Sequence, residues 1–237
     1  MMKRRDNVAI QRPGGFELTD RALEIANFRT NSKILDIGCG DGDTVDHLGK
    51  KGLKAEGIDM NLVKVSAAKK QFPGIAVKFG DGGFLDGYSS FTFDGIMMEC
   101  TLNAVSQPEE ALHEAYCVMK KGGRLIITDF YEKDPDPKQL KALAIEAVRR
   151  AGLRHSEGDC DEGTPEHFVD FRFDGAFFRE PLIKQLEQEI GFKVLKFEDH
   201  SDKLEEGFER YSSALKTKNA ERTRDIGYFV LVAQKPL

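Results

Sequence analysis

The sequence lacks three features that would point to common classes of protein: paired cysteines, a long apolar run and an excess of positive charge. None of its cysteines belongs to a Cys-x-x-Cys pair, which argues against a zinc site or a disulfide framework. We therefore expect no metal, and free thiols at Cys39, Cys100, Cys117 and Cys160. No stretch approaches the length of a membrane-spanning helix, and the basic start of the chain leads into polar residues rather than an apolar segment. These absences predict a cytoplasmic protein that does not contact a membrane.

The charge balance also argues against a nucleic-acid partner. The formal net charge is -5, so no general field would attract nucleic acid or anionic lipid. Hydrophobic residues make up 40% of the chain and charged residues 32%, which is ordinary for a folded globular protein. A length of 237 residues suits one α/β domain with an appended segment.

The order of apolar and amphipathic stretches predicts the fold class. Runs rich in Ile, Val and Phe alternate with amphipathic stretches, a pattern typical of a parallel sheet covered by helices on both faces. Strands are predicted at 33–37, 54–59, 75–80, 93–98, 124–128, 192–198 and 226–234.

The clearest predicted helix lies just before the fifth of these strands. Its apolar face would consist of Ala111, Leu112, Ala115, Val118 and Met119. Ser106 and Glu109 suggest a capping box, with Pro108 in the first turn. Gly122 and Gly123 are predicted to end the helix.

Three further segments carry weaker expectations. A helix around residues 22–26 is expected to pack against the edge of the sheet, and a long helix is expected after the proline-containing run 134–137. Residues 153–179 contain several phenylalanines, which we interpret as packing this segment onto the body of the protein.

A glycine-rich turn follows the first predicted strand. Gly38, Gly40 and Gly42 allow the backbone to approach a ligand closely, with free N–H groups facing it. Asp59 ends the second strand, 19 residues after Gly40, where a carboxylate can accept both hydroxyls of a ribose. Nicotinamide-binding and methyltransferase folds share this pattern, so the loop alone leaves both possibilities open.

Later motifs separate the two possibilities. Asp81-Gly82 closes the third strand, residues 93–100 form the fourth, and residues 125–129 follow the turn at Gly122 and Gly123. This series resembles the class I S-adenosylmethionine-dependent methyltransferases, in particular the broad group that includes quinone-biosynthesis enzymes. The resemblance covers about residues 30–130, and the last two strands match the family's edge hairpin. It implies a Rossmann-like, seven-stranded, mostly parallel sheet with one antiparallel strand, helices on both faces and a helical lid inserted after strand 5.

The resemblance also implies a division of the chain and a set of cofactor contacts. One methyltransferase domain would comprise an N-terminal arm and helix (1–30), a cofactor-binding half (31–131), a lid or substrate-side insertion (132–180) and the last helices and strands (181–237). S-adenosylmethionine would be bound through the loop for its methionine moiety, Asp59 for the ribose and the residues after strands 2 and 3 for the adenine. The implied contacts are Asp36, Gly38, Cys39, Gly40, Asp59, Met60, Asp81, Gly82 and Glu99.

Methyl transfer needs a well-aimed acceptor and the exclusion of water, and a general base only if the acceptor must lose a proton. The catalytic residue therefore stays open, with S-adenosylhomocysteine as the expected product. Candidates at the carboxyl ends of the strands are Glu99, Cys100, Asn103, Asp129 and Tyr131, and His155 and His167 lie in the insertion. The turn at residues 12–15 could close over the cofactor or be a plain turn. Since no Asn or Asp followed by Pro-Pro-aromatic ends the fourth strand, methylation of DNA or protein amides is disfavoured, and we expect a small-molecule acceptor.

Three alternatives stay open at this point. The first is an NAD(P)-dependent oxidoreductase, which shares the glycine loop and Asp59. The second is a non-catalytic cofactor-binding module, because a fold does not determine a function. The third is a metalloid methyltransferase that uses the scattered thiols to bind a soft centre. The acceptor, the attacked atom and the oligomeric state are not predicted.

Overall fold

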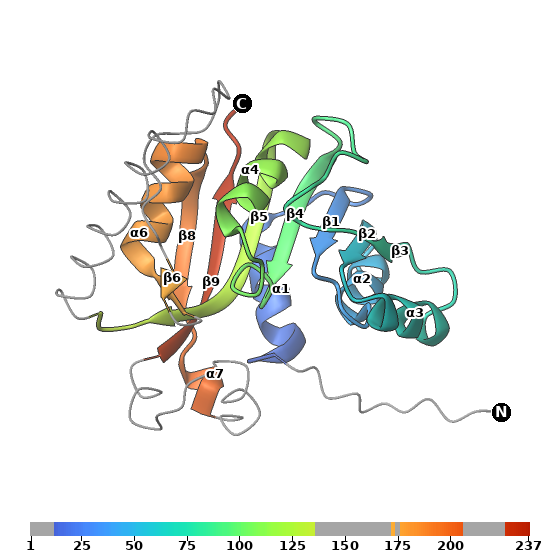
Figure 1. Cartoon of the computed structure of the whole chain (residues 1–237), viewed down its shortest axis with the longest axis horizontal. Coiled ribbons are helices and arrows are strands. Elements are labelled where there is room, and N and C mark those ends of the chain that lie inside the picture. The colour runs from blue at the N-terminus through green and yellow to red at the C-terminus, as the bar shows by residue number, and fades with distance from the viewer. Residues whose placement is uncertain (1–11, 136–171, 174–175, 206–225) are drawn as a thin grey trace, which may run out of the picture.

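The protein forms a nine-stranded mixed sheet in a computed structural model that describes residues 12–135, 172–173, 176–205 and 226–237 (Figure 1). The strands are β1 Lys33–Ile37, β2 Lys54–Asp59, β3 Val77–Phe79, β4 Phe93–Glu99, β5 Met119–Glu132, β6 Arg172–Phe173, β7 Ala176–Phe178, β8 Lys193–Asp199 and β9 Ile226–Gln234. Their order is β3-β2-β1-β4-β5, followed by β9 and β8. Among these seven strands only β9 runs antiparallel to β5, which confirms the predicted sheet.

Two short strands enlarge the predicted sheet. β7 pairs parallel with Tyr131 and Glu132 at the end of β5, and β6 pairs antiparallel with β7. Because β9 occupies one edge of β5, this hairpin continues the other edge beyond the end of β4. Phe177 and Phe178 are buried there, and the ring of Phe177 contacts that of Phe229 edge-on. The long helix expected after residue 137 lies outside the described residues.

Helices cover both faces of the sheet, as the sequence predicts. One face carries α1 Gly15–Ala26, α2 Asp43–Lys50 and α3 Leu62–Gln71. The other carries α4 Pro108–Val118, α6 Arg179–Lys184 and the π-helical turn η1 Gln185–Ile190. A short helix, α7 Asp202–Glu205, follows β8. No helix in the described part of the chain is both long and apolar enough to cross a membrane.

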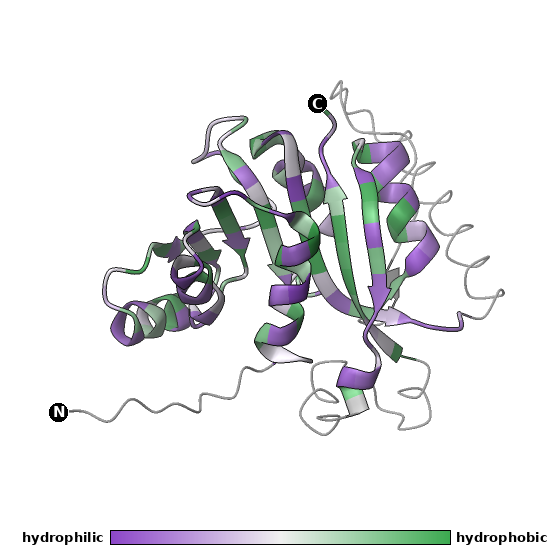
Figure 2. Cartoon of the chain, turned by 180° about the vertical axis from the view of Figure 1, so that it is seen from behind, coloured by the Kyte–Doolittle hydropathy of each residue, from purple (hydrophilic) through white to green (hydrophobic). Residues whose placement is uncertain are grey.

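The expected position of the first helix is wrong. α1 packs on the face of the sheet over β5 and β9, which are inner strands, rather than against an edge strand. Its buried side chains Leu18, Ala22 and Ala26 meet Tyr228 and other residues of the strands in one apolar cluster. Figure 2, seen from behind, shows this helix lying over the apolar strands with hydrophilic residues on its outer side. The turn before α1 is consequently held near the carboxyl end of β4.

The predicted junction between the fourth helix and the fifth strand is also wrong. α4 ends at Val118, and Met119 is already extended because it pairs with Phe93 on β4. Both Gly122 and Gly123 therefore lie inside the 14-residue strand β5. The N-cap is Gln107, without a side-chain cap, so the expected capping box is absent although Pro108 does occupy the first turn.

Candidate functional site

The glycine loop connects β1 to α2, and its glycines are required for different reasons. Gly38 and Gly40 both have positive φ, 77° and 53°. A Cβ at Gly38 would lie 2.2 Å from the Thr101 hydroxyl, so this glycine permits packing inside the protein. A Cβ at Gly40 would meet only the end of the Lys64 side chain, at 3.9 Å. The backbone at Gly40 thus borders open space, as it would if a ligand lay against it.

Asp59 fixes this loop from the end of β2. One carboxylate oxygen accepts a hydrogen bond from the Gly40 N–H at 2.9 Å, and the other accepts from the Asn61 N–H at 2.7 Å. Each oxygen has a second lone pair, so the partly exposed carboxylate can still accept from a diol. Asn61 in turn caps α3 through the backbone N–H groups of Val63 and Lys64.

Asp36 presents a buried carboxyl group beside the loop. It is 3% exposed, and no described residue donates a hydrogen bond to its carboxylate. Burial raises the pKa of Asp36 well above its ordinary value, the charge of Glu99 raises it further, and Arg12 acts in the opposite direction. A buried carboxyl without a partner is costly, and a cationic ligand would relieve that cost. The ammonium and sulfonium groups of S-adenosylmethionine fit this requirement.

Glu99 lies at the end of β4 and joins three elements. Its carboxylate accepts from the hydroxyls of Thr19 on α1, at 2.8 Å, and Thr44 on α2, at 3.0 Å. The Arg12 guanidinium forms an ion pair with it at 3.1 Å. The side chain of Glu99 is only 4% exposed. Sequence reasoning selected Glu99 but missed the two threonines, which no local pattern marks.

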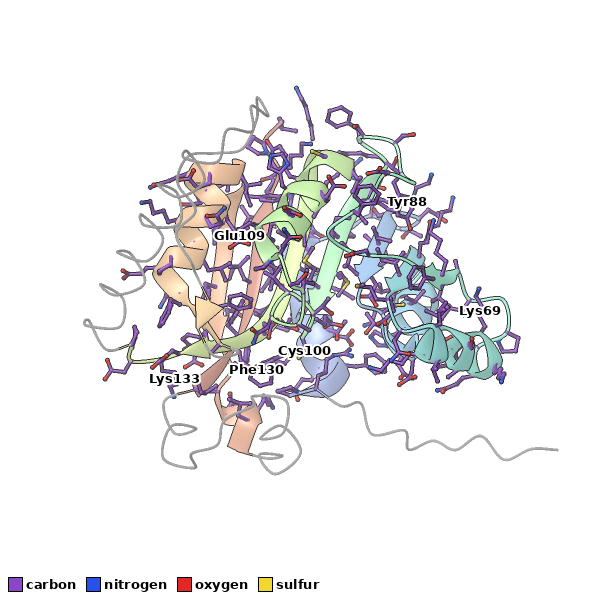
Figure 3. All side chains as sticks on the ribbon, in the orientation of Figure 1. Lys69, Tyr88, Cys100, Glu109, Phe130 and Lys133 are labelled. Atoms are coloured by element: carbon purple, nitrogen blue, oxygen red, sulfur yellow. The ribbon has the colours of Figure 1, made fainter. Side chains whose placement is uncertain are left out.

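Cys100 belongs to a buried polar chain behind Glu99. Its Sγ lies 3.1 Å from the hydroxyl of Tyr228, which donates to the Thr128 hydroxyl at 2.9 Å. Burial, and then the charge of Asp129, raise the pKa of the Cys100 thiol, which disfavours the nucleophilic thiolate. Its φ of 52° is unusual for a residue with a side chain. Figure 3 shows Cys100 near Phe130 at the end of the sheet where β4 finishes.

The remaining candidates after β4 and β5 divide into two groups. The buried Asp129 accepts from the backbone N–H groups of Asn103, at 3.0 Å, and Phe130, at 2.9 Å, and so holds the loop that follows β4. Tyr131 instead packs edge-on against Phe197 and Phe229 in the core. Burial, and then Asp199, raise the pKa of its hydroxyl. The candidates His155 and His167, and Cys160, lie outside the described residues.

The predicted adenine contacts surround the ends of β2 and β3. Met60 and Phe84 are 63% and 67% exposed, so both present apolar surface to solvent at this edge. Asp81 is exposed and accepts from the Gly83 N–H at 2.9 Å. Gly82 is buried, and a Cβ there would lie 2.5 Å from Ile37. These contacts stay predictions, as do those at Asp36, Gly38, Cys39, Gly40, Asp59 and Glu99.

Comparison with known proteins identifies the family. Residues 28–162, more than half of the chain, match the family model of a methyltransferase domain.

The chain belongs to this methyltransferase family.

The relatives of this methyltransferase agree with that assignment. The chain is 33% identical over 132 residues to an arsenite methyltransferase of Mus musculus, and the match covers 48% of the chain and 35% of the relative. It is 31% identical over 139 residues to a demethylmenaquinone methyltransferase of Streptomyces griseus, covering 58% of the chain and 59% of the relative. The chain therefore spans less than two thirds of either relative's length.

A solved structure agrees with the fold of the methyltransferase. Phosphoethanolamine N-methyltransferase 2 of Haemonchus contortus, in complex with S-adenosyl-L-methionine, superposes with a TM-score of 0.67 at 15% identity, over 98% of this chain and 55% of that one. The predicted family is confirmed, whereas the oxidoreductase alternative finds no support in these relatives.

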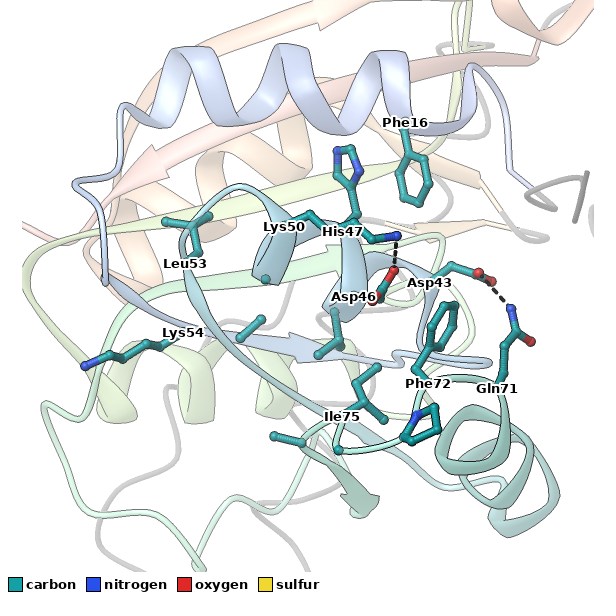
Figure 4. Close-up of a pocket in the computed structure, with 16 residues that line it drawn as sticks. Phe16, Asp43, Asp46, His47, Lys50, Leu53, Lys54, Gln71, Phe72 and Ile75 are labelled. Carbon is teal, nitrogen blue, oxygen red and sulfur yellow. Dashed lines mark hydrogen bonds and ion pairs between the residues drawn. The ribbon is translucent and has the colours of Figure 1, made fainter. Parts of the chain in front are cut away.

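A groove elsewhere on the methyltransferase does not coincide with this site. It measures about 1220 Å³ and lies between α2, α3 and the starts of β2 and β3 (Figure 4). An Asp46–Lys50 ion pair and a hydrogen bond from Gln71 to Asp43 border it, and the ring of Phe16 stacks on His47 at 3.9 Å. None of the predicted cofactor residues lines this groove. Within the described ranges the methyltransferase has no cluster of metal-ligating side chains.

Proposed function

We propose that this methyltransferase transfers the methyl group of S-adenosylmethionine to a small-molecule acceptor by in-line displacement. The observation that carries the proposal is the open space above Gly40, flanked by the unpaired carboxyl of Asp36 and by the carboxylate of Asp59. A turn with free space above it and carboxylates on both sides suits a ligand that carries positive charge and a diol.

The proposed division of labour follows the positions of the side chains. The loop and Asp36 would take the methionine moiety, Asp59 the ribose, and Met60 with Asp81 and Gly82 the adenine. A polarisable thioether beside a ring is favourable. The cofactor supplies an activated methyl group, and the protein contributes orientation and exclusion of water. We assign no general base, because a base is needed only if the acceptor must lose a proton, and the carboxylates of Glu99 and Asp129 already hold structural contacts.

Two observations support a small acceptor. The net charge of -5 does not favour a polyanion, and two relatives are named for arsenite and demethylmenaquinone, both of which are small. Arsenite itself is not our choice for this chain. Burial raises the pKa of both the Cys39 and Cys100 thiols, and the described residues bring no three thiols together.

Calorimetric titration tests the cofactor site. The wild-type protein should bind S-adenosylmethionine and S-adenosylhomocysteine but not NAD. Asp59→Asn should weaken S-adenosylmethionine by roughly 10-fold or more, because a carboxylate accepts hydrogen bonds more strongly than an amide. Asp94→Asn is a matched control, since Asp94 also accepts a backbone N–H, that of Lys33 at 2.8 Å, but lies at the start of β4.

The outcomes separate the cofactor from the acceptor. Binding of NAD alone, or equal losses in both variants, would contradict the proposed cofactor site. A second assay with S-adenosylmethionine labelled on its methyl group should place the label in small metabolites of a cell extract. Label recovered only in RNA or protein would refute the small-molecule acceptor while leaving the cofactor site intact.

A further inference from the structure

The segment before α1 brings a guanidinium to the proposed methionine end of the site. Arg12 precedes a tight turn in which its carbonyl accepts from the Gly15 N–H at 3.2 Å. Gly14 has a φ of 64°, and a Cβ there would lie 2.5 Å from the Leu18 side chain. The turn therefore requires glycine, and its geometry fixes where the arginine side chain begins.

Three contacts fix the head of this side chain. One terminal nitrogen, Nη2, donates to the Thr19 hydroxyl at 2.7 Å and pairs with Glu99 at 3.1 Å. The guanidinium also lies 5.4 Å from the centre of the Phe16 ring. The side chain is 12% exposed. Arg12 is therefore held in one orientation before any ligand arrives.

Part of the guanidinium is left without an acceptor. Arginine has five N–H donors in a planar fork, and the buried Nε of Arg12 has no hydrogen-bond partner among the described residues. An unpaired buried donor is costly, above all on a charged group. Because Nη2 already serves Thr19 and Glu99, the donors left for a ligand are those of Nη1 and Nε. A charge-assisted hydrogen bond from a guanidinium to a carboxylate is strong.

The surrounding charges indicate which ligand group the fork would take. The charges of Glu99 and Asp36 both act on Arg12, so two buried carboxyl groups accompany one guanidinium. The methionine end of S-adenosylmethionine carries an ammonium and a carboxylate. The carboxyl groups complement the first, and the guanidinium complements the second.

We propose that Arg12 binds the carboxylate of the cofactor's methionine end and that Glu99 is a positioning residue, which holds Arg12 in place. This assignment rests on the proposed function. It gives Glu99 a task that involves neither proton removal from the acceptor nor direct contact with the methyl group. Thr19 and Thr44 then orient Glu99 and connect α1 and α2 to the cofactor pocket.

Decarboxylated S-adenosylmethionine provides the test, because it lacks only the carboxylate. Calorimetry compares both ligands on the wild type, Arg12→Met and Arg12→Lys. The control is Arg21→Met, because Arg21 lies on α1, nine residues after Arg12, and pairs with Glu198 on β8 at 2.7 Å. Arg12→Met should weaken S-adenosylmethionine roughly 10- to 100-fold, as expected for a lost charged hydrogen-bond pair, and should change decarboxylated S-adenosylmethionine less than about twofold. Arg12→Lys should restore part of the loss.

Glu99→Gln separates positioning from direct contact. It keeps an oxygen that can accept from one of the two threonine hydroxyls, but it loses the charge that holds Arg12. It should therefore weaken S-adenosylmethionine and spare the decarboxylated ligand, as Arg12→Met does. In the double variant the second substitution should add little, because both act through one contact.

Several results would overturn the assignment. If Arg12→Met weakened the binding of both ligands equally, Arg12 would have a structural role only. Unchanged affinity would leave it without a ligand role. Tighter binding of S-adenosylmethionine would show that Arg12 competes with the cofactor for Glu99. If neither ligand bound the wild type, the proposed function itself would fail. Thermal unfolding shows whether each variant is folded. If Arg12→Met is not folded, the affinities of Arg12→Lys for the two ligands are compared with those of the wild type instead.

Discussion

Replacing each of two neighbouring loop glycines by alanine should give opposite results. Both Gly38 and Gly40 have positive φ, so either alanine costs about 1–2 kcal/mol of stability from backbone strain. At Gly38 the new methyl group also collides with Thr101, and overpacking adds roughly 1–3 kcal/mol. At Gly40 the methyl group enters open space. We therefore expect Gly38→Ala to be the less stable variant and Gly40→Ala the one that binds cofactor poorly.

The two readouts can be measured on the same samples. A domain of this size loses roughly 2–4 °C in Tm for each kcal/mol, so Gly40→Ala should unfold about 2–8 °C below the wild type and Gly38→Ala lower still. A methyl group in the cofactor's place should cost roughly 10- to 100-fold in affinity for S-adenosylhomocysteine, the equivalent of 1–3 kcal/mol. Thermal unfolding with and without S-adenosylhomocysteine reports both quantities. Wild-type affinity in Gly40→Ala would show that the cofactor does not bind in the open space at Gly40, and our placement of the site would be refuted.

Two further variants test the buried groups of the site. Burial raises the pKa of folded Asp36, so in the absence of cofactor the wild-type free energy of unfolding should fall as the pH rises from the ordinary aspartate range through the raised pKa. Asp36→Asn should make that fall smaller, and Asp43, whose pKa burial also raises, should account for part of what is left. Urea unfolding between about pH 4 and pH 8 measures it, and an unchanged slope in the variant would contradict the assignment. Cys100 has a φ of 52°, so Cys100→Gly should be about 1 kcal/mol more stable than Cys100→Ala, as judged by urea midpoints, and equal midpoints would mean that the backbone there is unstrained.

The parts of the site that the sequence predicts are those set by local pattern. An apolar strand followed by glycines, and a carboxylate at the end of the next strand, each depend on a few adjacent residues. In the structure Asp59 does meet the glycine loop, through the Gly40 N–H. The bounds of β1, β2 and β9 agree with the prediction for the same reason, since each strand is a short apolar run with clear breaks.

The parts that escape prediction are set by tertiary packing. Thr19 and Glu99 are 80 residues apart, and Cys100 and Tyr228 are 128 apart, so only the final position of α1 and β9 brings them together. Met119 reads as the last residue of an apolar helix face, yet pairing with Phe93 makes it extended. β6 and β7 are two and three residues long, too short to show a period of two.

The pairing of β7 with β5 has a consequence for how this protein can diverge. Glu132 at the end of β5 lies opposite Phe178 at the end of β7, so the two ends of the stretch between them lie close together. The entropy of closing such a loop grows only slowly with its length. Insertions and deletions in this stretch should therefore cost little stability, while the glycine loop and the strands beside it stay as they are.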